Sequence, residues 1–245
     1  MNKTRVDPNL YDENYFNQVC GGYQEFKNRI VTPWTQFAFN VCGCKVGDKV
    51  LDIGCGRGEM LKLCAQNKIE VLGIDYSKAA LLIAQKALEQ NIKTRLVKAN
   101  AVNIPFSDSE FDAVFMMDII EHLYPDELNY SLQEVSRVLK PGGRLVVHTV
   151  PNLNYYLYVY PVFRKLMKIA GKDIPKDPRE RVYHGHVHVN EQNMKSLKGI
   201  LARNGFQVRK SWLKQMTGNQ FKQFLSTLPL INNLLANDLF VLSEK

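Results

Sequence analysis

The stretch VLDIGCGRG, residues 50–58, decides the fold of this chain. It joins a short apolar run at 49–53, expected to be a strand, to a helix expected over 57–67. Three glycines at alternate positions let the backbone turn tightly and approach a ligand with no Cβ in the way. The spacing is GxGxG instead of the GxGxxG of dinucleotide sites, and an acid, Asp52, stands before it. Because a carboxylate there would repel a pyrophosphate, the loop indicates a ligand with a cation on this side.

Outward from this turn, short apolar runs alternate with amphipathic stretches. Such alternation predicts a parallel sheet with right-handed crossovers and helices on both faces. Strands are expected at 70–74, 93–98, 111–117, 144–150, 206–214 and 238–243. Helices are expected at 77–90, at 126–139 with a stop at the PGG of 141–143, and at 191–204 with Gly205 as the C-cap.

A second acid, Asp75, ends the next expected strand in GIDY, residues 73–76, where a carboxylate accepts both hydroxyls of a ribose. With Asp52 and Asp75 in register, residues 49–151 resemble the class I S-adenosylmethionine-dependent methyltransferases of the Rossmann-like, small-molecule (type 11) group. The resemblance implies an α/β fold. We expect a Rossmann-like three-layer sandwich with a mostly parallel seven-stranded sheet and an antiparallel last strand.

The resemblance also implies S-adenosyl-L-methionine as the cofactor. In that family the glycine loop surrounds the methionine part, and the acid after the second strand binds the ribose. Asn100 stands where an acid usually meets the adenine amino group, and its carbonyl can still accept a hydrogen bond. The expected cofactor-binding residues are Asp52, Gly54, Cys55, Gly56, Asp75, Tyr76, Asn100, Ala101, Met117 and Asp118.

Methyl transfer converts a sulfonium cation into a neutral thioether, so the protein chiefly aligns the nucleophile and excludes water. A base helps only if the acceptor must lose a proton. The candidates are Asp118 and His122 in DIIEHL, residues 118–123, since family members often carry Glu-His there. The alternative is that Glu121 and His122 only shape the loop.

Three histidines alternate in YHGHVHV, residues 183–189, so a strand would turn them to one face. No carboxylate at a fixed spacing accompanies them, and methyl transfer needs no metal where a base or the acceptor's own charge suffices. We therefore expect no metal site and assign the run to the substrate side. Cys42 and Cys44 are expected to be packing residues, with metalloid-binding thiols as the alternative.

Charge is divided unevenly along the 245 residues, of which 45% are hydrophobic and 23% charged. The net charge is +8, yet residues 1–151 carry 17 basic and 18 acidic side chains, while 152–245 carry 15 basic and 6 acidic. No stretch resembles a signal peptide or approaches 18 apolar residues. Five cysteines, an odd number, fit reduced thiols in a cytoplasm.

We divide the chain into an N-terminal helical cap, 1–47, and a methyltransferase domain, 48–245, with a lid-like insertion at 152–189. In residues 152–176, four tyrosines precede a basic stretch, a composition typical of an interfacial helix on an anionic membrane. A lid packed on the active site is the alternative, and the two are compatible. We expect a cytoplasmic protein that touches the inner face of a membrane.

The predicted activity is methyl transfer by in-line displacement to a small-molecule or lipid-like acceptor. The alternatives are an RNA or protein methyltransferase, or a protein that binds the cofactor without turnover. Nucleic acid is not an expected partner, because no RNA-binding module is present and the fourth expected strand ends in MMDI, residues 116–119.

Overall fold

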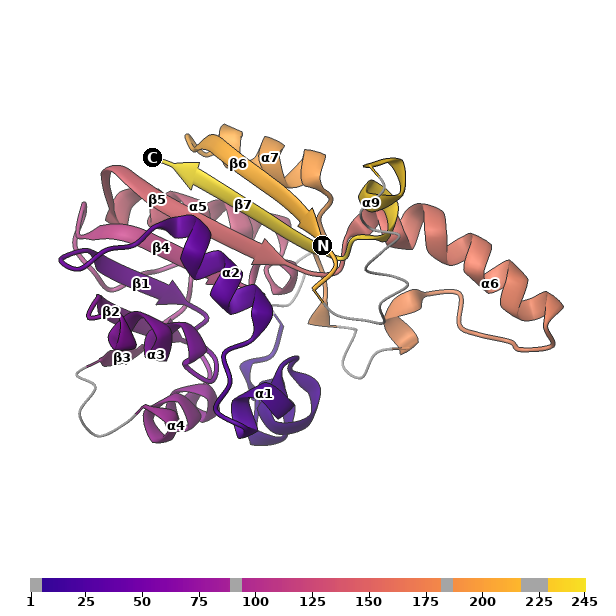
Figure 1. Cartoon of the computed structure of the whole chain (residues 1–245), viewed down its shortest axis with the longest axis horizontal. Coiled ribbons are helices and arrows are strands. Elements are labelled where there is room, and N and C mark those ends of the chain that lie inside the picture. The colour runs from indigo at the N-terminus through magenta and orange to yellow at the C-terminus, as the bar shows by residue number, and fades with distance from the viewer. Residues whose placement is uncertain (1–5, 89–93, 182–186, 217–228) are drawn as a thin grey trace.

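The structure is a computed structural model that describes residues 6–88, 94–181, 187–216 and 229–245. Within these residues seven strands form one sheet in the order β3-β2-β1-β4-β5-β7-β6 (Figure 1). All neighbouring strands are parallel except where β7 pairs with β5 and β6. The predicted mostly parallel sheet with an antiparallel last strand is therefore confirmed. The strands are β1 (Lys49–Ile53), β2 (Glu70–Asp75), β3 (Arg95–Lys98), β4 (Phe111–Met117), β5 (Leu139–Thr149), β6 (Gln207–Lys214) and β7 (Asp238–Glu244).

Helices cover both faces of the sheet, which completes the three layers. The central strand β4 is buried on both sides, as its unbroken apolar run predicts. Ala113 and Phe115 pack on one face, and Val114 and Met116 pack on the other. The first face is covered by α2 (Pro33–Cys42) and α3 (Glu59–Gln66), and the second by α5 (Pro125–Val138) and α7 (Met194–Arg203).

Several expected boundaries were wrong. The helix expected from residue 57 begins at Glu59, because Gly58 adopts the left-handed conformation (φ +80°) that ends the loop. The strand expected from residue 144 begins at Leu139, before the PGG. Leu139 pairs with Phe111 across a bulge, so the backbone enters the sheet as soon as the helix ends. The helix expected from residue 191 begins at Met194, and its C-cap is Asn204 instead of the expected Gly205, which follows with φ +84°.

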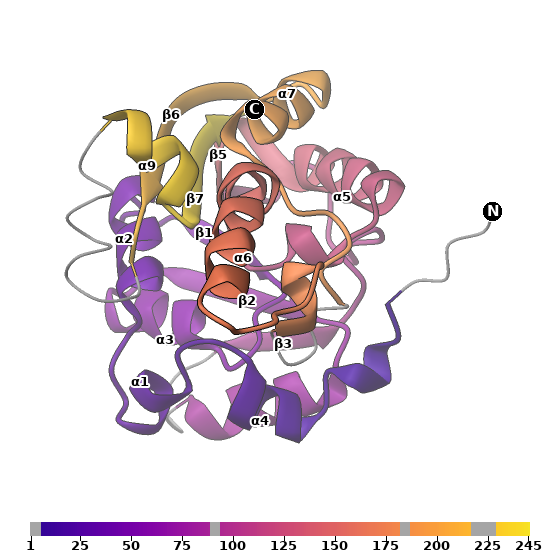
Figure 2. The same cartoon turned by 90° about the vertical axis from the view of Figure 1, so that its right-hand side faces the viewer.

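Three helical segments lie outside the layers. Residues 6–28, including α1 (Tyr23–Lys27), cross the carboxyl ends of the parallel strands beside α4 (Lys78–Ala87). The insertion forms α6 (Tyr160–Ile169), which extends away from the sheet, with α9 (Pro229–Leu235) at its base (Figures 1 and 2). No helix of the described residues has both the length and the apolar character needed to cross a membrane.

The strand expected in the histidine run is not seen where the structure describes it. His188 and Val189 are irregular, and His184 and His186 lie outside the described residues.

Candidate active site

All ten expected cofactor-binding residues, together with His122, line one cavity of about 260 Å³. The cavity lies at the carboxyl ends of β1, β2 and β4, where ligands bind in open α/β sheets. Whether these residues contact a cofactor stays a prediction, but the fold brings them to a single place.

The glycine loop follows β1 and is held to the end of β2. Gly54 N and Cys55 N donate hydrogen bonds to Ile74 O at 2.8 and 3.0 Å. Gly56, with φ +48°, turns its N–H to Asp75 Oδ2 at 3.0 Å. Ser77 N donates to the other carboxylate oxygen at 2.8 Å. Each oxygen of Asp75 therefore keeps one lone-pair direction for a ligand in the cavity.

Asp52 is an almost fully buried acid on the cavity wall. Burial raises the pKa of its carboxyl to about 8, with a further contribution from the charge of Asp75. Burial also raises the pKa of Asp75, to about 6, against the backbone hydrogen bonds that lower it. Among the described residues neither acid has a cationic partner, and two such buried acids favour a positively charged ligand in this cavity.

The remaining expected residues line the far side of the cavity. Ala99 N donates to Asp75 O at 3.1 Å, which fixes the chain after β3. Asn100 Oδ1 accepts from Val102 N at 3.2 Å, so its carbonyl keeps one further acceptor direction. Ala101 is buried beside it, and Met117 ends β4 at the cavity wall.

The N-terminal segment, part of the helical cap expected at residues 1–47, lies over the cavity, and we call residues 6–28 the roof. Tyr11, Tyr15 and Phe16 line the cavity. Arg57, from the glycine loop, is buried and donates hydrogen bonds to Phe16 O (2.8 Å), Cys20 O (3.1 Å) and Gly21 O. One guanidinium thus ties the loop to the roof.

A second tie joins the other end of the roof to the body. Ser77 Oγ donates to Tyr11 O at 2.6 Å, and Tyr11 Oη lies 3.0 Å from His122 Nδ1.

Asp118 follows β4 with φ +52°, in the left-handed region that aspartate tolerates better than most residues. Its carboxylate lies 2.7 Å from Nδ1 of the buried His148, whose Nε2 lies 3.3 Å from Asp238. Burial alone would lower the pKa of His148, but the two carboxylates raise it to about 10. His148 is therefore a buried imidazolium that lies between Asp118 and Asp238.

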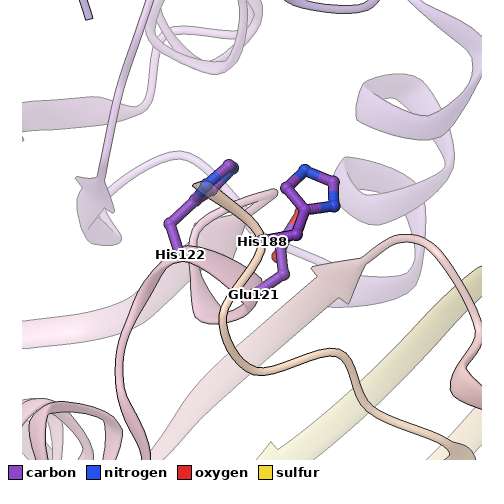
Figure 3. Close-up of side chains that lie close together, drawn as sticks. All are labelled: Glu121, His122 and His188. Atoms are coloured by element: carbon purple, nitrogen blue, oxygen red, sulfur yellow. The ribbon is translucent and has the colours of Figure 1, made fainter. Parts of the chain in front are cut away.

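Glu121, His122 and His188 converge beside the cavity (Figure 3), with one ligand-type atom from each lying within 4.8 Å of the others. Glu121 and His122 belong to the short helical turn after β4, and His188 comes from the segment that follows the insertion. From the sequence, His188 was interpreted only together with its neighbouring histidines, so its proximity to Glu121 and His122 was not predicted. Nothing in the spacing links residue 188 to residue 121.

Comparisons with known proteins agree with this geometry. A family model described as a methyltransferase domain matches residues 51–147. The demethylmenaquinone methyltransferase of Staphylococcus epidermidis is 30% identical over 201 residues, 78% of this chain and 83% of the relative. That of Tropheryma whipplei is 32% identical over 171 residues, 64% of this chain and 69% of the relative. A solved S-adenosylmethionine-dependent methyltransferase of Methanosarcina mazei is 22% identical with a TM-score of 0.63, covering 84% of this chain and 96% of that one.

A Rossmann-like sheet with a glycine loop and acids at the ends of its first two strands defines the class of enzymes that hold a nucleoside-bearing cofactor at the sheet edge. The chain belongs to the class I S-adenosylmethionine-dependent methyltransferases. The predicted family, cofactor and enzyme class are thereby confirmed. The residues present fit the cofactor, because the buried acids suit its sulfonium and ammonium charges and Asp75 suits its ribose.

Proposed function

We propose that this enzyme methylates a lipid-like quinone acceptor at the surface of an anionic membrane on the cytoplasmic side. The acceptor class is proposed from the sequence similarity to a demethylmenaquinone methyltransferase, which is 30% identical to this chain over 83% of its own length. An acceptor with a long isoprenoid tail stays in the bilayer, so its enzyme needs a surface that meets the membrane.

S-adenosylmethionine, when bound, supplies a methyl group on a positively charged sulfur. Asp52 and Asp75 would hold it from the glycine loop and from the end of β2. The roof residues Tyr11, Tyr15 and Phe16 would exclude water from the reacting atoms, which protects the transfer from hydrolysis.

Asp118 is the better of the two candidate bases. Burial, together with the neighbouring His188, lowers the pKa of His122 to about 3, so its imidazole is a weak proton acceptor at neutral pH. Asp118 lines the cavity, and its carboxylate is positioned there by His148, whose Nδ1 lies 2.7 Å away. We propose that Asp118 takes the proton of the acceptor, and that His122 positions Tyr11.

The membrane contact is proposed for α6. Tyr158, Val162, Leu166 and Ile169 recur at helical spacing, and each side chain is more than half exposed. Lys165, Lys168 and Lys172 are exposed along the same helix and the turn after it. An exposed apolar stripe bordered by lysines is the pattern of a helix lying in the interface of an anionic bilayer.

The acceptor is tested by incubating the enzyme with methyl-labelled cofactor and demethylmenaquinone, supplied both as the quinone and as its reduced quinol. We expect label in the organic-soluble product. Labelled cofactor in a cell lysate serves as the parallel experiment. Transfer into RNA or protein, with none into lipid extract, would overturn the proposed acceptor, and binding of cofactor without any transfer would overturn turnover itself.

The membrane contact is tested by flotation with vesicles of phosphatidylglycerol and phosphatidylcholine. Changing Lys165, Lys168 and Lys172 together to Glu should release the protein, since each basic residue near an anionic surface contributes about 1 kcal/mol. The matched control changes three exposed lysines elsewhere, Lys68, Lys86 and Lys195, to Glu. Equal loss in both triple variants would mean that net charge, not α6, drives flotation, and would contradict the proposal.

A further inference from the structure

We propose that Glu121, His122 and His188 bind a first-row divalent metal cation such as Zn²⁺ at the acceptor end of the active site. The inference rests on the proposed function only for the kind of acceptor that the cation would meet. Two imidazoles and one carboxylate form the ligand set of catalytic zinc and of other open first-row metal sites.

The three side chains need only a small adjustment to close on an ion. Their ligand-type atoms all lie within 4.8 Å of one another (Figure 3), whereas ligands around a tetrahedral Zn²⁺ at about 2.0 Å stand about 3.3 Å apart. The rings of His122 and His188 already meet edge to face, with centroids 4.8 Å apart. Rotation about the side-chain torsions can supply the difference.

The contacts of His122 suit a metal ligand. Its Nδ1 lies 3.2 Å from Val187 O and 3.0 Å from Tyr11 Oη. A carbonyl only accepts and a hydroxyl also can, so a proton on Nδ1 serves both neighbours and leaves the lone pair of Nε2 for a cation. A ligating histidine commonly donates its other N–H to a backbone carbonyl in this way.

Glu121 gains most from a cation. Its side chain is almost fully buried, so a negative charge on its carboxyl is shielded from water. One oxygen accepts a hydrogen bond from Thr149 Oγ1 at 2.8 Å, which orients the carboxylate as an outer-shell partner does. A divalent cation would supply the countercharge that favours its ionised form.

The backbone fixes the two parts of the cluster against each other. Val189 N and Asn190 N donate to Glu121 O at 2.9 and 3.1 Å. The segment that carries His188 is therefore attached directly to the turn that carries the other two ligands.

Three protein ligands leave a coordination position open on the cation. Since His122 also lines the cavity, that position can face the acceptor. A ring hydroxyl bound there would have its pKa lowered, as metal-bound water has, and would release its proton to solvent or to Asp118. The cation would thus hold the acceptor and make it a stronger nucleophile, with no change in the cation's own charge.

The test measures Zn²⁺ binding to the metal-free full chain by titration calorimetry, without an activity assay. All proteins carry Cys42→Ser and Cys44→Ser, because the two sulfurs lie 3.2 Å apart and are competing zinc ligands. We expect one equivalent of Zn²⁺, with affinity lowered more than about 100-fold by Glu121→Gln and by His188→Gln. Such a loss exceeds the 10–100-fold typical of outer-shell partners.

Glu134→Gln is the matched control for Glu121→Gln, because the carboxylate of Glu134 is paired with Arg137 on α5 and does not line the cavity. It should keep full zinc affinity, and cofactor binding reports that each variant is folded. Absence of stoichiometric zinc in the parent, or equal affinity in the parent and both ligand variants, would overturn the metal site. Zinc binding without methylation of demethylmenaquinol would instead overturn the proposed acceptor and leave the metal site standing.

Discussion

The two sides of the active site are built in opposite ways. On the cofactor side, Asp52 and Asp75 are buried, and Arg57 and Ser77 tie the glycine loop and roof together. On the proposed acceptor side, the insertion extends α6 away from the sheet (Figure 1), and several apolar side chains of α6 are exposed. We propose that the charged cofactor is bound by a fixed polar site, whereas the lipid-like acceptor is reached through a surface that a membrane covers.

Removing the carboxylate of Asp75 should cause the largest loss on the cofactor side. Asp75→Ala deletes the acceptor of two backbone hydrogen bonds and the proposed acceptor of the ribose hydroxyls, and charge-assisted bonds contribute about 1.5–3 kcal/mol each. Calorimetry should record S-adenosylmethionine binding weakened by more than about 100-fold. The control Asp112→Asn alters an acid at the opposite end of β4 and should leave the affinity unchanged. Unaltered affinity in Asp75→Ala would refute the ribose assignment.

The affinity for S-adenosylmethionine should fall as the pH is lowered. The pKa of Asp52, raised to about 8, means that below this pH the carboxyl is increasingly protonated and loses its attraction for a cation. Between pH 8 and pH 6 the ionised fraction drops about 50-fold, and the affinity should follow. Titration calorimetry across this range measures it. Asp52→Asn should flatten the profile, and an equally steep profile in that variant would assign the effect to another group.

Loosening the roof should have a smaller effect. Arg57→Met keeps an unbranched stem but removes the guanidinium and with it every hydrogen bond to the roof. We expect affinity for the cofactor to fall about 10-fold, in line with one to two net hydrogen bonds, and proteases to cut within residues 6–28. Limited proteolysis with and without cofactor measures the change. Resistance equal to that of the parent would mean that the roof is held by its aromatic packing alone.

The smallest effect is expected on α6, in a matched pair of substitutions. Val162→Ser alters a side chain that is 58% exposed and should change the free energy of unfolding by less than about 0.5 kcal/mol. Val146→Ser, fully buried in β5, should cost about 2–4 kcal/mol. Urea denaturation compares the two. A large loss in the free energy of unfolding for Val162→Ser would show that the protein itself covers α6. The contrast between the cofactor side and the acceptor side would then disappear.

Local pattern was enough to predict the sheet and the residues around the cavity. The glycine loop and the acids after β1 and β2 stand at the ends of apolar runs, and parallel strands bring their carboxyl ends to one edge. The PGG at 141–143 was misread as a boundary because a turn signal in the sequence does not reveal that Leu139 already pairs with Phe111.

What the sequence could not reveal depends on contacts between distant residues. Arg57 donates hydrogen bonds to backbone carbonyl groups near residue 20. Because every residue has a backbone carbonyl, the sequence does not indicate which ones Arg57 contacts. The pairing of His148 with Asp118 and Asp238, and of His188 with Glu121, arises only once the strands are ordered in space. A polar residue within an otherwise apolar strand, such as His148 in β5, is the one sequence feature that would have indicated a buried polar pairing.

The backbone at Asp118 limits how this active site can be redesigned. With φ at +52°, position 118 accepts aspartate, asparagine or glycine at little cost, whereas glutamate and most other residues would be strained by about 1–3 kcal/mol. A mutant library at this position therefore samples few useful side chains. New acceptor preferences are better sought by varying the flexible surfaces around Asp118 than by replacing it.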